Sequence, residues 1–165
     1  MKKQAPSATL KKVVVQFADR TSVNGYLNPA KLGKSEVFEL LTQDGEHQEI
    51  AIKDVRGVYF VREFTSNFSP ERKAFLSRPK MDGLWIRVRF RDNDLLEGVV
   101  PNDLLVFLDS GVQITPPDPN GETQRMFIPR AAITEMRVLG VVGIARRRAA
   151  APPAAGEEQP LLFKK

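Results

Sequence analysis

One stretch of the sequence occurs twice, and this internal repeat constrains the fold more than any other feature. Residues 13–27, VVVQFADRTSVNGYL, align without a gap with residues 86–100, IRVRFRDNDLLEGVV. Four aligned pairs are identical, namely Val15 with Val88, Phe17 with Phe90, Asp19 with Asp92 and Gly25 with Gly98. Because such a repeat indicates one supersecondary unit built twice, we expect two similar small units in tandem.

Each copy of the repeat predicts two strands joined by a tight turn. Val13, Val15 and Phe17 alternate with other positions, which is the period of a half-buried strand. The turns ADRTS and RDNDL carry Asp and Asn, which suit tight-turn geometry. Gly25 and Gly98 fall inside the second strand and predict a sharp bend or a bulge that would curl a small sheet.

The rest of each copy repeats the same theme. SEVFELLTQDGEHQEIAI predicts a hairpin around a DG turn, and VQITPPDPNGETQRMFI predicts another with its turn at residues 118–121. Residues 52–61 and 128–139 each predict a strand, a short turn and a final strand. The sequence therefore predicts about five short strands per copy and almost no helix.

A linker separates the two copies, and it carries the signals of one short helix. The segment 69–71, Ser-Pro-Glu, is typical of a helix start, and Pro79 is a natural end. We expect Phe75 and Leu76 to face inward from this helix.

The resulting organisation has five parts. We expect a flexible N-terminus (1–10), a first unit called copy one (11–64), a linker with a short helix (65–83), a second unit called copy two (84–142) and a disordered tail (143–165). Residues 149–156 of the tail are only Ala, Pro and Gly, so no core can form there and the segment is typical of a spacer.

The composition excludes several classes of function. The chain has no cysteine, so disulfides, thiolate nucleophiles and cysteine zinc sites are excluded. The only histidine, His47, lies in the polar run TQDGEHQE, where a solvated loop residue is the first interpretation and a weak metal site with Asp44, Glu46 and Glu49 is the alternative. No P-loop, GxGxxG, HExxH or GxSxG motif is present. We expect a protein that is not an enzyme and has no cofactor and no metal.

Charge and hydropathy bear on location and partners. The formal net charge of +5 fits an anionic partner such as nucleic acid. No apolar run has the roughly 18 residues that a bilayer span needs, and the start, MKKQAPSATLKK, lacks the apolar core of a secretory signal. We therefore expect a cytoplasmic protein without membrane contact.

The repeated stretches FADRTSVNGYL and FRDNDLLEGVV, with the closing segments, resemble the Sm/Hfq-like fold. This resemblance implies an all-β chain of two small Sm/SH3-like five-stranded barrels in tandem. QRMFIPRAAITEM is similar to the second Sm motif of bacterial Hfq proteins, where Pro129, Arg130 and Ala131 stand in place of a tyrosine, a lysine and a histidine. Only Arg130 keeps the character of its RNA-contacting counterpart. The whole chain also resembles uncharacterised bacterial proteins with paired domains.

The strand LWIRVRFRD (84–92) offers the first candidate surface. Alternation places Trp85, Arg87, Arg89 and Arg91 on one face and the apolar residues on the other. Arginine clamps phosphate and tryptophan stacks on a base, so this face is a candidate for single-stranded RNA or DNA. The alternative is a solvated face whose arginines pair with acids on a neighbouring strand.

The tail offers two more candidates. Arg146, Arg147 and Arg148 suit contact with a phosphate backbone, or form a solvated charge run. Gln159, Leu162 and Phe163 in QPLLF resemble the pentapeptide that binds the bacterial sliding clamp, in which the Gln makes polar contacts and the Leu-Phe pair fills an apolar pocket. The alternatives are that the apolar tip docks on a unit of its own chain or a neighbour, or has no role.

Three functional hypotheses remain. The first is a non-enzymatic nucleic-acid-associated protein recruited to the sliding clamp through its tail. The second is an Sm-like RNA-binding regulator. The third is a protein-interaction scaffold without a nucleic-acid role. Because exposed edge strands extend sheets between subunits, a homo-oligomer is a further expectation.

Overall fold

The computed structural model describes residues 9–69, 72–108 and 110–143, and its regular elements are all strands or 3-10 turns. Copy one holds β1 (Lys11–Phe17), β2 (Ser22–Leu27), β3 (Val37–Thr42), β4 (His47–Ala51) and β5 (Val55–Val61). Copy two holds β6 (Gly83–Phe90), β7 (Leu95–Val100), β8 (Gly111–Ile114), β9 (Thr123–Pro129) and β10 (Ile133–Val142). The prediction of an all-β chain with five strands per copy is confirmed.

Short 3-10 turns occupy matching places in the two copies. η1 (Pro29–Lys31) and η3 (Leu104–Leu108) lie between the second and third strands of each copy. η2 (Ile52–Asp54) and η4 (Arg130–Ala132) lie just before the last strand. The repeat seen in the sequence is therefore also a repeat of local structure. Within the described part of the chain, no helix has the length and apolar character needed to span a bilayer.

The first turn of each copy has the same geometry. Arg20 and Asn93 adopt left-handed φ angles of 72° and 66°. In both turns the preceding aspartate stabilises this conformation, since Asp19 Oδ1 and Asp92 Oδ1 each accept a hydrogen bond from the amide two residues further on. The turn predicted from Asp and Asn is confirmed in both copies.

Gly25 and Gly98 are required by close packing and not by a bulge. The ladders β1–β2 and β6–β7 run through both glycines without a register shift. A Cβ at Gly98 would lie 2.0 Å from Ile114 Cγ2, and one at Gly25 would lie 2.6 Å from the carbonyl oxygen of Leu41. Of the two predicted alternatives, a sharp bend or a bulge, the bulge is wrong at these positions, and the glycines let the next strand approach closely.

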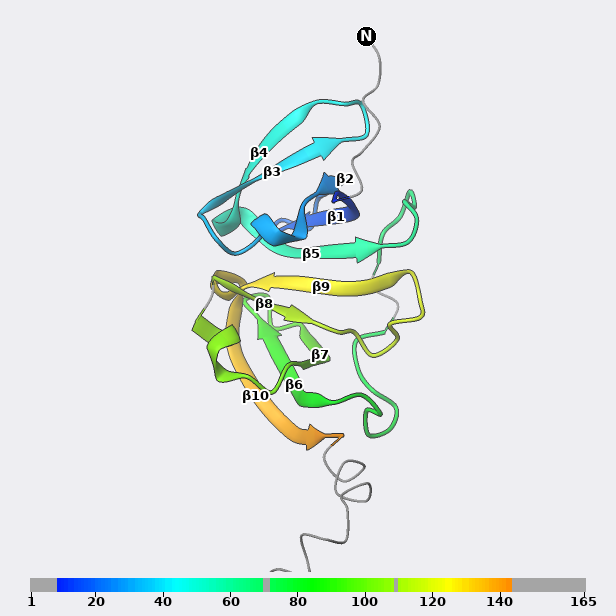
Figure 1. The fold of residues 1–165 in the computed structure, drawn as a ribbon, viewed down its shortest axis with the longest axis vertical. Coiled ribbons are helices and arrows are strands. Elements are labelled where there is room, and N and C mark those ends of the chain that lie inside the picture. Colours follow the sequence, from blue (N-terminus) through cyan, green and yellow to red (C-terminus); the bar gives the residue numbers. More distant parts are fainter. Residues whose placement is uncertain (1–8, 70–71, 109, 144–165) are drawn as a thin grey trace, which may run out of the picture.

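The hydrogen-bonded ladders form two sheets and no closed barrel within the described residues. One sheet has seven strands in the order β4-β3-β2-β1-β5-β9-β8, and the other has three in the order β10-β6-β7. The seven-stranded sheet continues from copy one into copy two, because β5 and β9 pair antiparallel in the middle of the molecule (Figure 1). We call this β5–β9 pairing the seam.

Each copy contributes side chains to the core of the other through the seam. Tyr59 and Val61 of β5 lie in the apolar cluster of copy two, together with Met126. Phe127 of β9 points the other way and lies in the cluster of copy one, together with Val58. Because the two faces of the seam cover two different cores, the copies form one folded body and are not independent barrels connected only by a linker.

The linker helix predicted from residues 69–79 is not seen among the described residues of that segment, and Pro70 and Glu71 lie outside them. The linker backbone bonds to copy two instead, since Lys73 O accepts from Glu97 N and Phe75 N donates to Glu97 Oε2. Phe75 is half-buried and packs edge-on against Trp85, but it belongs to neither apolar core cluster, and Leu76 is exposed. Tertiary contacts have outweighed a helix-start signal that is weak on its own.

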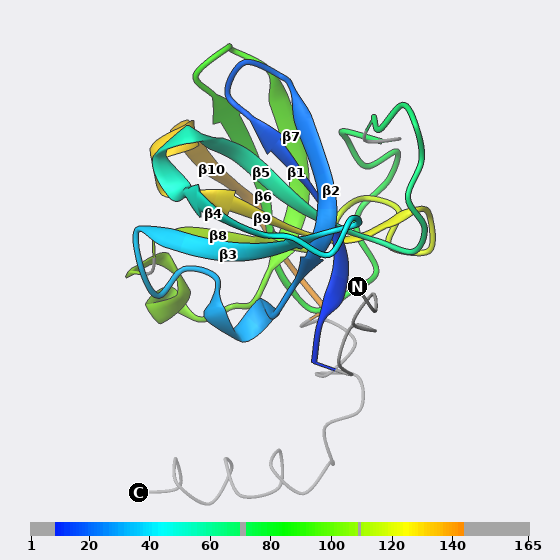
Figure 2. The same cartoon turned by 90° about the horizontal axis from the view of Figure 1, so that it is seen from above.

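The two copies are stacked along the long axis, so that β3 of copy one lies over β8 of copy two when seen from above (Figure 2). The strand β4 lies in the upper half of this stack, and β10 runs from the junction of the two copies to the lower end (Figure 1).

Candidate functional site

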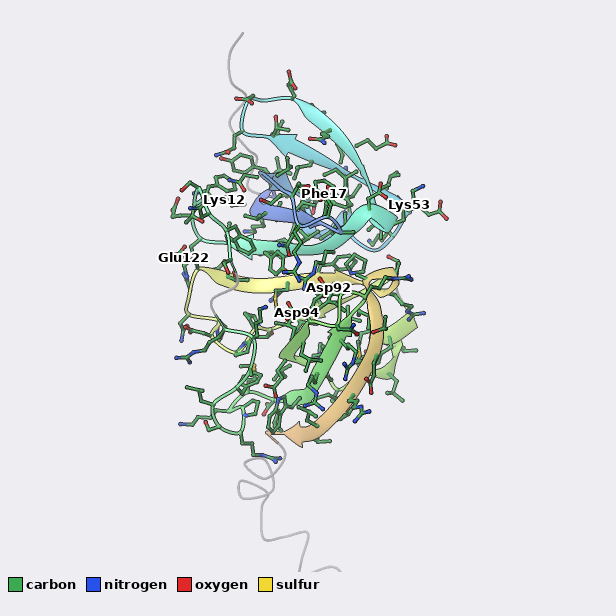
Figure 3. The ribbon with its side chains drawn as sticks, turned by 180° about the vertical axis from the view of Figure 1, so that it is seen from behind. Lys12, Phe17, Lys53, Asp92, Asp94 and Glu122 are labelled. Atoms are coloured by element: carbon green, nitrogen blue, oxygen red, sulfur yellow. The ribbon has the colours of Figure 1, made fainter. Side chains whose placement is uncertain are left out.

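A buried arginine joins the two copies beside the seam. Arg56, at the start of β5, has only 7% of its side chain exposed. Its guanidinium donates to Asp92 Oδ2 at 3.1 Å and to Asp94 Oδ2 at 2.9 Å, both in the first turn of copy two. It also lies 3.9 Å from the centroid of the Phe90 ring and donates to Gln16 Oε1. Figure 3 shows both aspartates where the copies meet. Charge, hydrogen bonds and ring contact together hold this arginine in place.

Further cations complete the cluster around these two aspartates. Arg20 Nη2 donates to Asp92 Oδ2 at 2.8 Å, and Lys73 Nζ from the linker donates to Asp94 Oδ2 at 2.9 Å. Three separate parts of the chain therefore converge on one turn. We call Arg20, Arg56, Lys73, Asp92 and Asp94 the charge clamp.

The clamp changes the pKa of its acids. Burial alone would raise the pKa of Asp92, but the hydrogen bonds from the Asp94 amide and from Arg56, with the nearby Arg56 charge, outweigh burial and lower that pKa to about 2. Burial would also raise the pKa of Asp94, but the hydrogen bond and charge of Lys73, with the charge of Arg56, outweigh burial and lower that pKa. Burial raises the pKa of Tyr59, whose hydroxyl lies beside Arg56.

The lowered pKa of Asp92 predicts acid sensitivity. A carboxyl whose pKa is lower in the folded state contributes stability above its unfolded pKa and loses it as pH falls through the folded value. We expect the free energy of unfolding to fall between about pH 4 and about pH 2. Asp92→Asn should flatten this fall, whereas Asp44→Asn in an exposed turn should leave it unchanged, as measured by urea unfolding at several pH values. An equally steep fall in Asp92→Asn would contradict the assignment.

A groove lies above the clamp, between η2 of copy one and η4 of copy two. It has a volume of about 530 Å³. Its floor is apolar, with Val55 and Phe90, and its cations come from both copies, as Lys53 and Arg91. The remaining lining residues are Ala18, Arg56, Asp92, Ala131 and Ala132. Lys53 has no ion-pair partner in the described part of the chain, so its charge is open to an anion.

The outer face of β6 carries the residues that the sequence singled out. Trp85 Nε1 donates to Glu97 Oε1 at 3.1 Å, which fixes the indole ring. Arg89 Nε donates to Glu135 Oε2 at 3.1 Å on β10. Arg87 lies between them, directly opposite Glu97 on β7 and Arg137 on β10, and makes no ion pair with any described residue. The face is thus partly neutralised by acids, with Arg87 as its open cation.

The other predicted cations lie near the groove or outside the described residues. Arg91 Nε donates to the Ala131 carbonyl at the groove mouth. Arg130 is exposed on η4 next to it, without an ion pair to any described residue. The tail residues Arg146, Arg147, Arg148, Gln159, Leu162 and Phe163 lie outside the described residues, so their roles stay predictions.

Sequence reasoning missed the residues that join the copies. Arg56 and Lys53 lie in the segment IKDVRGV, whose aligned counterpart in copy two has Thr134 and Ala131. A charged residue in one copy that aligns with a small, uncharged residue in the other indicates a contact that only one of the two copies makes. Arg137 was also missed; it pairs with Glu135 and adds a third arginine to the outer face.

His47 lies at the start of β4 and is exposed, paired with Glu39 on β3. No group of three or more metal-ligating side chains is found among the described residues.

Comparison with known proteins gives a family and no function. A family model described as a family of unknown function (DUF6982) matches residues 9–140, which covers both copies and the linker. No curated protein matches the chain. No solved structure matches it either.

Proposed function

The chain belongs to the DUF6982 family, whose function is unknown, and we propose that it is a non-enzymatic protein that binds single-stranded nucleic acid. The binding surface is the outer face of β6, which leads through Arg91 into the groove between the copies. The observation that carries the proposal is the pair of open cations on this path, Arg87 on the same strand face as Trp85 and Lys53 in the groove at the other end of β6.

The chemistry of this surface suits a phosphate backbone better than a base sequence. Guanidinium and ammonium groups neutralise phosphates and release counterions, whereas a single fixed indole offers stacking to any base. The acids Glu97 and Glu135 on the same face repel phosphates and restrict a bound strand to the line of open cations. We therefore expect moderate, salt-sensitive affinity without sequence specificity.

We further propose that each copy is an Sm/SH3-like unit. The antiparallel neighbours β1–β2, β1–β5, β2–β3 and β3–β4, with a 3-10 turn before the last strand, support this assignment in copy one. Copy two has β6–β7, β6–β10 and β8–β9, and a single bridge, Val99 to Thr115, in place of the fourth ladder. This assignment keeps the Sm-like RNA-binding regulator as a form of the same function.

Fluorescence polarisation of labelled single-stranded RNA and DNA tests the proposal. Arg87→Ala/Lys53→Ala should weaken binding at low salt by roughly tenfold or more and reduce the slope of log affinity against log salt by about 1–2. The matched control, Lys11→Ala/Lys34→Ala, removes the same charge from exposed positions off this path. Equal losses in both variants would leave only net charge as the cause, and no binding at low salt would refute the proposal.

Recruitment to the sliding clamp remains a separate proposal that rests on the sequence of the tail. A pull-down with purified clamp should retain the full-length chain and lose Phe163→Ala, while nucleic-acid binding stays the same in both. The scaffold hypothesis is favoured by a different observation, the exposed aliphatic side chains Val138, Leu139 and Val141 on β10. Exposed apolar groups on an edge strand favour a protein partner.

A further inference from the structure

The repeat assigns a counterpart to every strand of the seam. β10 of copy two corresponds to β5 of copy one, since Phe90 pairs with Ile133 as Phe17 pairs with Val55. β4 of copy one corresponds to β9 of copy two, since each pairs with the third strand of its own copy. The seam therefore joins the last strand of one copy to the fourth strand of the other.

A fourth strand and a last strand, β4 of copy one and β10 of copy two, each lack a partner on one side among the described strands. β4 ends the seven-stranded sheet and β10 ends the three-stranded sheet, so each has one edge outside any described ladder. The two strands belong to opposite halves of the stack and are not paired with each other (Figure 1). An unpaired edge is a template for a strand from another chain.

Burial at equivalent positions shows what β10 lacks. Phe60 on β5 is 7% exposed in the cluster of copy one, which includes Phe127 of β9, and Val61 is 5% exposed in the cluster of copy two. Their counterparts on β10, Val138 and Leu139, are 56% and 37% exposed. An edge with exposed aliphatic side chains is costly in water and favours a partner that covers it.

We infer that β10 of one chain pairs with β4 of a second copy of the same chain, so that the contact made once within each molecule is made again between molecules. The partner is fixed by continuity with the internal seam, which already joins these two types of strand. The contact is head to tail, since it uses different surfaces on the two molecules. Such contacts build closed rings or open filaments.

The register of the internal seam can be transferred to the contact between molecules. The internal pairs are Val58–Phe127, Tyr59–Met126 and Phe60–Arg125. Transfer through the repeat places Met136, Arg137 and Val138 of one chain opposite Glu49, Gln48 and His47 of the next. These pairs are more polar than the internal ones, so we expect an association that depends on concentration and not an obligate one.

One contact limits the length of the pairing. Arg78 Nη2 of the linker donates to the carbonyl oxygen of Val141, near the end of β10. The free part of β10 is therefore the stretch 136–139, which matches the residues 58–61 that β5 uses in the internal seam.

Analytical ultracentrifugation of the full-length chain, with three sets of variants, tests this inference. The wild-type chain should gain mass as its concentration rises about a hundredfold from the micromolar range. Val138→Lys/Leu139→Lys blocks β10, and Gln48→Lys/Glu49→Lys blocks β4 by placing a like charge opposite Arg137. Each blocked chain alone should stay monomeric. The matched control is Leu76→Lys, an exposed apolar residue of the linker, which should assemble like the wild type.

Mixing the two blocked chains gives the decisive result. In the mixture, the chain with the blocked β4 offers an intact β10, and the chain with the blocked β10 offers an intact β4. The two chains should therefore form a one-to-one dimer and nothing larger. A wild-type chain that stays monomeric throughout would overturn the inference. So would assembly that survives the β4 block, because that result indicates pairing of β10 with itself or docking through the tail.

Discussion

Replacing Arg56 by methionine should lower the free energy of unfolding by about 3 kcal/mol. Methionine keeps much of the side-chain volume but removes the charge that Asp92 and Asp94 face from their buried side. It also leaves Gln16 Oε1 without its strongest donor. Both aspartates retain Arg20 or Lys73 and are partly exposed, which keeps the loss at the lower end for a broken buried pair. Urea unfolding followed by Trp85 fluorescence measures the change.

A rescue variant separates lost charge pairing from lost packing. Arg56→Met/Asp92→Asn/Asp94→Asn removes the uncompensated charges together with the arginine, so it should recover part of the lost stability. Arg130→Met, which removes an exposed arginine from η4, is the control and should change stability by no more than about 0.5 kcal/mol. If the triple variant is as unstable as Arg56→Met, or less stable, the charge clamp is not what holds the copies at this turn.

Local pattern was enough to predict the strands, because it is repeated. The alternation Val13, Val15, Phe17 and the Asp-bearing turn recur in copy two, and both stretches fold as strands with the predicted turn. The half-buried pattern is confirmed for β6 but is wrong for β1, whose other face is also buried because Val14 lies in the cluster of copy two. A hydrophobic period of two and a turn residue act over a few neighbouring positions, so their signal is present in the sequence itself.

The seam could not be predicted in the same way. Phe127 and Glu49 occupy equivalent positions, and the apolar run Met126–Ile128 indicates burial, but nothing in it shows that Phe127 enters the core of the other copy. The predicted linker helix was wrong for a related reason. Bonds from Lys73 and Phe75 to Glu97 join positions far apart in the chain, and these long-range contacts outweigh the local helix signal.

The candidate surface was predicted in part. Alternation placed Trp85, Arg87 and Arg89 on one strand face, but only the register across β6 and β10 shows that Glu135 pairs with Arg89 and leaves Arg87 open. Lys53 reaches the groove from the other copy, so its role depends on how the copies stack.

Phe127→Ala should destabilise both copies at once, by about 3–5 kcal/mol. Phe127 belongs to β9 of copy two, yet it is 2% exposed within the core cluster of copy one. Removing the ring leaves a cavity in copy one. It also weakens the seam, which holds Tyr59 and Met126 in the core of copy two. Trp85, the only tryptophan, reports unfolding of copy two, and far-UV circular dichroism reports both copies. We expect both signals to shift together to lower denaturant.

The control and the contrary outcome follow from the same geometry. Leu105→Ala removes an apolar side chain that is 68% exposed on η3, and it should leave both transitions within about 0.5 kcal/mol of the wild type. If Phe127→Ala instead splits the transitions, so that Trp85 keeps its wild-type midpoint while part of the dichroism is lost earlier, the copies are separable domains. Coincident transitions would mean that the shared seam makes the tandem repeat a single cooperative unit.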